Sequence, residues 1–154
     1  MDSKTLSEIK EFFKKEDLSL FVLGRQIRCI KGSGITILFN LLHEEECSLV
    51  NAFVMDKVVG KAAAALMVIG HVREVNTHII STPALKLLED NDVKVSFDEE
   101  VENILNRAQD GLCPMELLTQ DCPTAEECYQ KIEEKLKNAH ILNISVETKD
   151  IKEK

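Results

Sequence analysis

Cys113 is the residue of this sequence best suited to covalent chemistry. It opens the string C-P-M-E, in which Pro114 favours the first position of a helix. Backbone N–H groups and the positive end of the dipole at a helix start stabilise a thiolate. Asp110 and Glu116 lie near in sequence and act in the opposite direction. Cys113 is therefore either a nucleophile or substrate contact, or a small capping and packing residue, as most free cysteines are.

A second group of candidates lies between Asp56 and Lys61. The pattern predicts one helix that begins with Asp56 as its N-cap and ends at Gly70. A glycine inside a helix, as predicted for Gly60, costs about 1 kcal/mol relative to alanine, so its missing side chain indicates close packing or a ligand against the backbone. Lys61 precedes a run of alanines, where its charge needs a carboxylate partner such as Asp56 or serves acid–base chemistry. A functional lysine and a structural ion pair both stay open.

Three further polar residues stand where ligands often bind. Asn106 and Arg107 offer an amide and a bidentate donor suited to a phosphate or carboxylate, or else form a loop salt bridge. Ser81 follows a predicted strand, and open α/β sheets bind ligands beyond the carboxyl ends of their strands. Ser81 is equally well explained as an ordinary helix cap.

The spacing of the metal-ligating residue types predicts no metal site and no cofactor. Successive cysteines are separated by 18, 66, 9 and 6 residues, so the chain has no Cys-x-x-Cys motif. The string His43-Glu44-Glu45 falls at the end of a predicted helix without partner thiols. A zinc site is therefore not expected.

Alternating strands and helices must position these candidates. Two short strands, Leu18 to Leu23 and Gln26 to Ile30, are predicted to form a hairpin, and strands alternating with helices after it predict parallel pairing with helical crossovers. The other predicted strands are Val75 to Ile80 and Val93 to Phe97. The other predicted helices are Ser3 to Glu16 with Thr5 and Glu8 as its capping box, one from Ile35, Pro83 to Glu89, Glu99 to Leu105, one opened by Pro114, and Thr124 to about Asn138.

Composition limits the function classes. The 154 residues carry 27 acidic and 19 basic side chains, a net charge of −8 that disfavours duplex nucleic acid as a partner. The longest apolar stretch, 62–70, is too short to span a bilayer, and the N-terminus lacks the apolar segment of a signal peptide, so we expect a cytoplasmic protein with free thiols. We expect a main domain at 1–121 and a charged C-terminal helix and tail at 122–154; self-association is left open.

Two strings together resemble a known family. They are D-K-V-V-G-K-A-A-A from Asp56 to Ala64 and N-R-x5-C-P-M-E from Asn106 to Glu116. The chain is similar through them, over roughly Leu6 to Leu118, to an uncharacterised prokaryotic family of domains of unknown function with a cytidine deaminase-like fold. The resemblance implies an α/β protein with three α/β/α layers and a mixed sheet.

The same resemblance bears on the metal. Active cytidine deaminases hold zinc through a His/Cys-x-Glu and a Pro-Cys-x-x-Cys motif at two helix starts. The corresponding positions here are Asp56 to Lys61 and Ser81 to Ala84, and neither supplies a ligand set. The resemblance therefore implies the fold without zinc-dependent deamination.

The functional hypothesis is a small-molecule site, with a nucleotide-like ligand among the candidates. In its catalytic form Cys113 is the nucleophile, Lys61 stabilises the thiolate or acts as acid or base, and Asp56 orients Lys61. The substrate-binding residues are Asn106 and Arg107, which hold an anionic group, together with Ser81 and Gly60. Whether the site is catalytic stays open. The alternatives are a non-catalytic ligand sensor, a zinc deaminase with an unrecognised site, and a protein-interaction module that uses the charged C-terminal helix.

Overall fold

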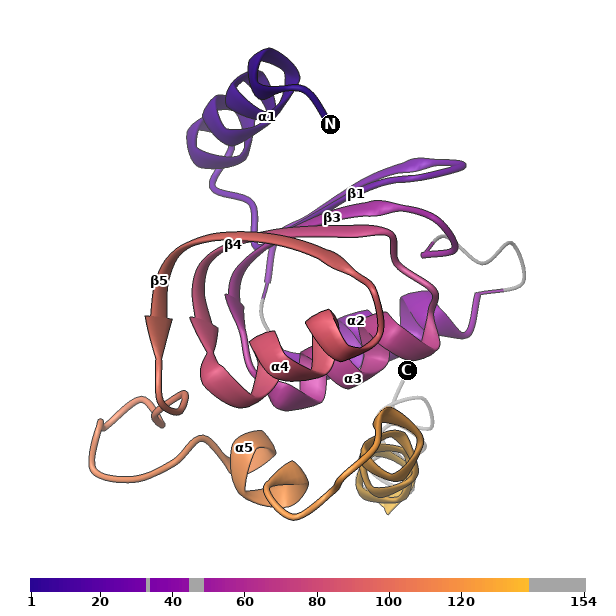
Figure 1. Cartoon of the computed structure of the whole chain (residues 1–154), viewed down its shortest axis with the longest axis vertical. Helices are drawn as coiled ribbons and strands as arrows, with labels where there is room; N and C mark the ends of the chain where they lie inside the picture. The colour runs from indigo at the N-terminus through magenta and orange to yellow at the C-terminus, as the bar shows by residue number, and fades with distance from the viewer. Residues whose placement is uncertain (33, 45–48, 139–154) are drawn as a thin grey trace, which may run out of the picture.

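A five-stranded mixed sheet forms the centre of the molecule, with helices on both of its faces (Figure 1). The computed structural model describes residues 1–32, 34–44 and 49–138. The strands run in the order β2-β1-β3-β4-β5, with β1 antiparallel to both neighbours and β3, β4 and β5 parallel. They are β1 (Leu20–Leu23), β2 (Ile27–Ile30), β3 (Phe53–Val59), β4 (Glu74–Ser81) and β5 (Lys94–Val101).

Six helices are found in the described parts of the chain. Together with the mixed sheet, these helices confirm the predicted α/β class. Five of the helices are α1 (Ser3–Lys15), α2 (Ile35–Leu42), α3 (Lys61–Ile69), α4 (Thr82–Asp90) and α5 (Pro114–Thr119). The sixth spans 125–138, and its start has the predicted cap, because Glu127 donates its N–H to the hydroxyl of Thr124 at 3.2 Å.

The N-terminal helix α1 lies on one face of the sheet by itself. Phe13 packs there against Phe21 of β1 and Phe53 of β3. Its N-cap is Asp2, whose carboxylate accepts the N–H of Thr5 at 2.8 Å, so the predicted capping role of Thr5 and Glu8 is wrong. The sheet face under α1 also holds a buried ion pair, 3.2 Å long, between the N-terminal ammonium of Met1 and Glu74.

Strand β3 replaces the first part of the predicted helix from Asp56 to Gly70. Residues Phe53–Val59 are extended and pair with β1 on one side and β4 on the other, and only Lys61–Ile69 is helical. Five apolar residues among the seven, three of them valines, suit a central strand, and pairing with two neighbours outweighs the capping preference of Asp56. The predicted N-cap role of Asp56 is therefore wrong, and Gly60 is the N-cap of α3.

The second half of the sheet follows the predicted order. Ser81 ends β4 and caps α4, because its hydroxyl accepts the N–H of Ala84 at 3.3 Å. Strand β5 runs on to Val101 with Ile79 opposite Glu99, so the predicted helix from Glu99 to Leu105 is wrong. Parallel pairing with β4 keeps Glu99 and Glu100 in an extended strand.

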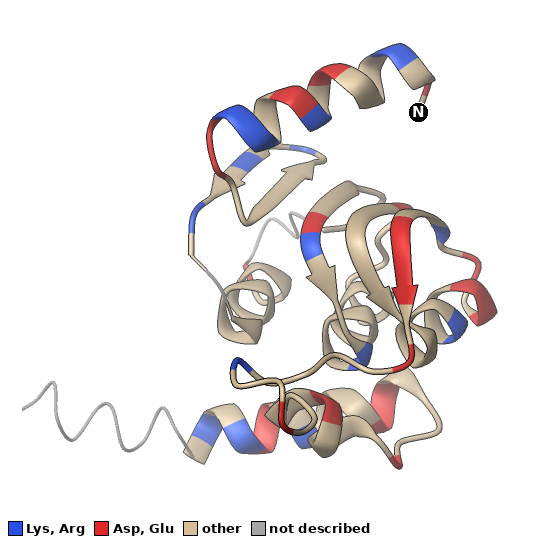
Figure 2. Cartoon of the chain, turned by 90° about the vertical axis from the view of Figure 1, so that its left-hand side faces the viewer, with Lys and Arg blue, Asp and Glu red and all other residues tan. Residues whose placement is uncertain are grey.

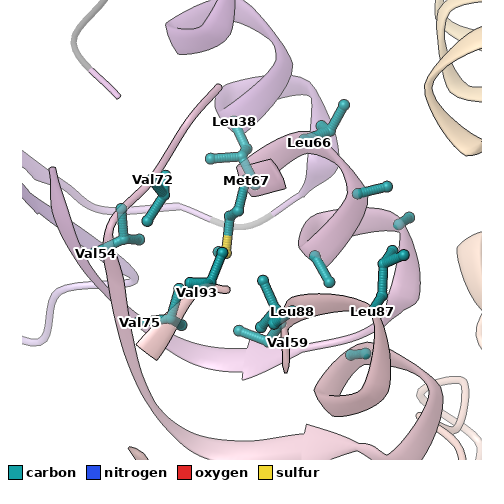
Figure 3. Close-up of a cluster of buried hydrophobic side chains, with 14 of the residues drawn as sticks. Leu38, Val54, Val59, Leu66, Met67, Val72, Val75, Leu87, Leu88 and Val93 are labelled. Carbon is teal, nitrogen blue, oxygen red and sulfur yellow. The ribbon is translucent and has the colours of Figure 1, made fainter. Parts of the chain in front are cut away.

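The main core lies between the sheet and the helices α2, α3 and α4. Figure 3 shows Leu38, Met67 and Leu88 from these three helices converging on side chains of the sheet. The fully buried alanines of α3 let that helix lie close to the strands. Ala125, Cys128 and Ile132 join the same core, so the helix 125–138 packs on the sheet domain.

Charged side chains of both signs are distributed over the surface. Figure 2 shows Lys and Arg interspersed with Asp and Glu on α1 and on the helices of the opposite face. Among the described residues, no helix is long and apolar enough to cross a membrane.

Candidate functional site

A cavity of about 400 Å³ opens between the starts of α2 and α3 and the segment that leads into α5. Apolar side chains form most of its wall, among them Ile35, Leu38, Val58, Ile104 and Met115. The ionisable residues at its wall are Asp56, Lys57, Cys113 and Glu116. Two glycine N-caps, Gly34 of α2 and Gly60 of α3, also line it.

Asp56 reaches the cavity because it lies on a strand. Side chains alternate along β3, and Asp56 shares the parity of Val54, which belongs to the core under α2 and α3. Burial raises the pKa of Asp56 to about 7, and the backbone N–H groups of Val58 and Lys57 only partly oppose that rise. The ammonium of neighbouring Lys57 is 3.1 Å from Asp17. Among the ion pairs of the described residues, none involves Asp56.

Glu116 closes one end of the cavity as a buried carboxylate held by backbone groups. One of its oxygens accepts the N–H of Lys61 at 2.7 Å, and the other accepts the N–H of Ile104 at 3.1 Å. The first contact caps α3, whose own N-cap, Gly60, has no side chain. A negative charge at a helix start is favourable, so this carboxylate is compensated without a cationic side chain.

Gly60 is required for space. Its φ of −95° is open to any residue. A Cβ added there, however, would lie 2.8 Å from Oε1 of Glu116 and 3.3 Å from Cγ1 of Ile104. The two strings that carry the family resemblance therefore meet in space, with the glycine of one against the glutamate of the other.

Lys61 is engaged through both its backbone and its side chain. Its ammonium donates to the carbonyl of Cys122 at 2.6 Å and to that of Gln120 at 3.4 Å. These carbonyls follow α5, so the lysine ties the start of α3 to the end of α5. Lys61 is not among the described residues that line the cavity.

Cys113 does line the cavity, as the half-buried N-cap of α5. Its backbone N–H donates to the carbonyl of Ile104 at 2.9 Å, which fixes the start of this short helix. The structure therefore brings three of the candidates, Asp56, Gly60 and Cys113, to one cavity.

The other three candidates lie elsewhere in the described structure. Ser81 is fully buried at the start of α4. The side chain of Asn106 exchanges hydrogen bonds with Asp110 at 2.8 and 3.2 Å, and Arg107 is exposed in the same loop. None of the three is among the residues found at the cavity wall.

Sequence reasoning missed the apolar wall and the position of Glu116. Ile35 and Leu38 have the spacing of an ordinary helix core, and Ile104 fell in a segment predicted to be helical. In the sequence, Glu116 stands out only as a negative charge near Cys113. The one available signal is Gly60, whose missing side chain indicates close packing but does not identify Glu116 as the neighbour.

The zinc site of cytidine deaminases does not fit these residues. Within 1–32, 34–44 and 49–138, no three His, Cys, Asp or Glu side chains group as metal ligands. Asp56 stands in a strand, and Ser81 caps a helix through its hydroxyl. Neither segment therefore supplies zinc ligands at the start of its helix.

Comparison with known proteins gives both a family and a solved relative. Residues 8–136 match the family TM1506, described as a domain of unknown function, DUF1893. The crystal structure of a DUF1893 family protein (TM1506) from Thermotoga maritima matches with a TM-score of 0.79 and 28% sequence identity, over 88% of this chain and 92% of that one. No curated protein matches the chain. Because the family match spans most of the sequence, including most of the helix 125–138, the chain belongs to the DUF1893 family.

Proposed function

We propose that this protein binds a small organic molecule in the cavity between α2, α3 and α5, on a fold of the cytidine deaminase-like type. The observation that carries the proposal is the position of half-buried Asp56 at the wall of a cavity of about 400 Å³. Small-molecule sites commonly have volumes of about 300–1,000 Å³ and combine an apolar wall with a few polar groups. The cavity has that composition.

A metal-independent enzyme is the second candidate, and the protonation behaviour of Asp56 favours it. A carboxyl with a pKa of about 7 exchanges a proton at neutral pH, as a general acid or base must. Cys113 supplies a thiol at the same cavity. Lys61 is bound to carbonyls of Gln120 and Cys122, so in this version Asp56 takes the acid–base role and Cys113 the nucleophilic one.

The test of binding is to fill the cavity. Ala63 lines it from α3, and Ala63→Leu adds bulk inside it. Ala108→Leu makes the same change at an exposed loop position. A set of neutral aromatic fragments, screened by ligand-observed NMR, should bind the native protein and Ala108→Leu but lose binding to Ala63→Leu. Bound fragments should also slow the alkylation of Cys113, followed by peptide mass mapping.

Two results would overturn the binding proposal. One is saturable binding that Ala63→Leu leaves unchanged, which would place the fragments elsewhere. The other is the absence of saturable binding by every fragment. Catalysis is tested separately with Cys113→Ala. This variant removes the proposed nucleophile but keeps the cavity and Asp56, so it should still bind the fragments.

A further inference from the structure

We propose that the ligand of this cavity is a small organic monocation, an amine or amidinium with an apolar body, whose charged group pairs with the carboxyl of Asp56. This inference rests on the proposed binding function and names its ligand class. It follows from the charges and contacts of the cavity wall.

Asp56 forms no ion pair with a cationic side chain in the part of the chain that the structure describes. The backbone N–H groups of the next two residues only partly offset the cost of burying its charge, and a cation would offset the remainder. The two nearby lysines of its own segment are engaged elsewhere, Lys57 with Asp17 at 3.1 Å and Lys61 with the carbonyl of Cys122 at 2.6 Å. A cationic group of a ligand would therefore form the ion pair that Asp56 does not form with the described protein residues.

The net charge of the cavity wall also favours a cation. Its titratable groups besides Asp56 are Lys57, Cys113 and Glu116. The two helix starts at the wall contribute about half a positive charge each, which is less than two ionised carboxylates. Since the ammonium of Lys57 is already paired, the ionised cavity is negative and repels an anionic ligand.

The apolar part of the cavity wall favours an apolar body for the ligand. Ile35, Leu38 and Met115 offer an apolar surface in the same cavity. Such a wall favours a flat or branched hydrocarbon body over a polyhydroxylated one, because buried hydroxyl groups without partners are costly. A cation of the size of benzamidine meets both requirements.

The experiment compares three probes of one shape that differ in charge. Benzamidine is a cation, benzamide is neutral and benzoate is an anion. Their affinities are measured by titration calorimetry for the native protein, Asp56→Asn and the exposed control Asp92→Asn. Asp92 has a φ of 60°, which asparagine also adopts readily, so the control preserves the backbone. Circular dichroism checks that each variant is folded.

At about pH 8 we expect benzamidine to bind the native protein and Asp92→Asn about tenfold or more tightly than benzamide does, a difference of about 1.4 kcal/mol. Asp56→Asn should remove this preference and leave the affinity for benzamide nearly unchanged. Below about pH 7 the native protein should weaken toward benzamidine, with a proton released on binding, because the pair requires ionised Asp56.

Equal or tighter binding of benzamide or benzoate would overturn the cationic assignment and leave the binding proposal intact. Retention of the benzamidine preference in Asp56→Asn would overturn it too, since the cation would then sit elsewhere. If none of the three probes binds while the neutral fragments of the cavity test do, only the charge assignment fails. If those fragments fail as well, the binding function itself falls.

Discussion

Glu116 caps the first turn of α3 from outside that helix, by accepting the backbone N–H of Lys61 at 2.7 Å across 55 residues of sequence. Its second oxygen holds Ile104 at 3.1 Å, so one carboxylate fixes both the helix start and the loop that covers the cavity. Gly60 leaves the space for this contact. The two strings that carry the family resemblance thus form one structural unit beside the site.

Substitutions of Gly60 and Glu116 should have coupled effects on stability, because the two residues are in contact. Gly60→Ala should destabilise the protein by about 1–3 kcal/mol because its Cβ would overlap Glu116, as overpacking generally does. Glu116→Ala should cost about 2–4 kcal/mol because it leaves two N–H groups without their acceptor. The double variant should cost less than the sum of the two, since the clash is then absent. Urea unfolding measures all three, and strictly additive effects would contradict the contact.

The second prediction concerns pH. The pKa of Asp56 is raised to about 7 in the folded protein, above its ordinary value of 3.8, so the unfolded chain ionises first as the pH rises. The folded state then loses stability between about pH 4 and pH 7, and the loss is complete above that range. The neutral variant Asp56→Asn escapes this penalty. Its stability relative to the native protein should therefore rise by roughly 2–3 kcal/mol between about pH 5 and pH 8.

Urea unfolding at several pH values measures this difference, with Asp92→Asn as the control that should show no such trend. A constant difference between native protein and Asp56→Asn across the range would mean that Asp56 titrates normally.

The third prediction concerns thiol reactivity. Burial, together with the neighbouring thiol of Cys122, raises the pKa of Cys128 to about 12, so this group stays a thiol at neutral pH. Cys122 is likewise buried, whereas Cys29 is exposed and Cys113 half-buried at the cavity. Iodoacetamide should therefore modify Cys29 and Cys113 in the folded protein, and Cys122 and Cys128 only after unfolding. Peptide mass mapping with and without urea separates the sites; early modification of Cys128 would contradict its burial.

Local signals in the sequence were enough for much of the fold. The hairpin of β1 and β2 and the order β4-α4-β5 follow from apolar alternation and from the Ser81-Thr82-Pro83 helix start. Strand β3 could not be placed from local signals, because Asp56 resembles a helix cap and the strand is defined by its pairing with β1 and β4. Those pairings are contacts between distant parts of the chain.

The candidate site was also predictable only in part, because residue types can be read from the sequence but contacts between distant residues cannot. Residue type alone singled out Asp56, Gly60 and Cys113, which the structure places at one cavity. The partner of the Lys61 ammonium had no signal, because backbone carbonyls such as that of Cys122 are present at every position of a sequence. Side-chain chemistry can be listed from a sequence, but which backbone groups it meets depends on the fold.

The last prediction separates a structural Lys61 from a functional one. Lys61→Met keeps most of the aliphatic stem and removes the charge that holds the carbonyls of Gln120 and Cys122. We expect the free energy of unfolding to fall by about 1–3 kcal/mol, the usual value for hydrogen bonds of a charged donor. Hydrogen exchange should become faster in 125–138, which follows these carbonyls, while benzamidine binding should change little because Lys61 does not line the cavity among the described residues. Lys86→Met, at an exposed pair with Asp90, is the matched control and should leave stability nearly unchanged. Unchanged stability of Lys61→Met combined with lost probe binding would instead make Lys61 part of the site.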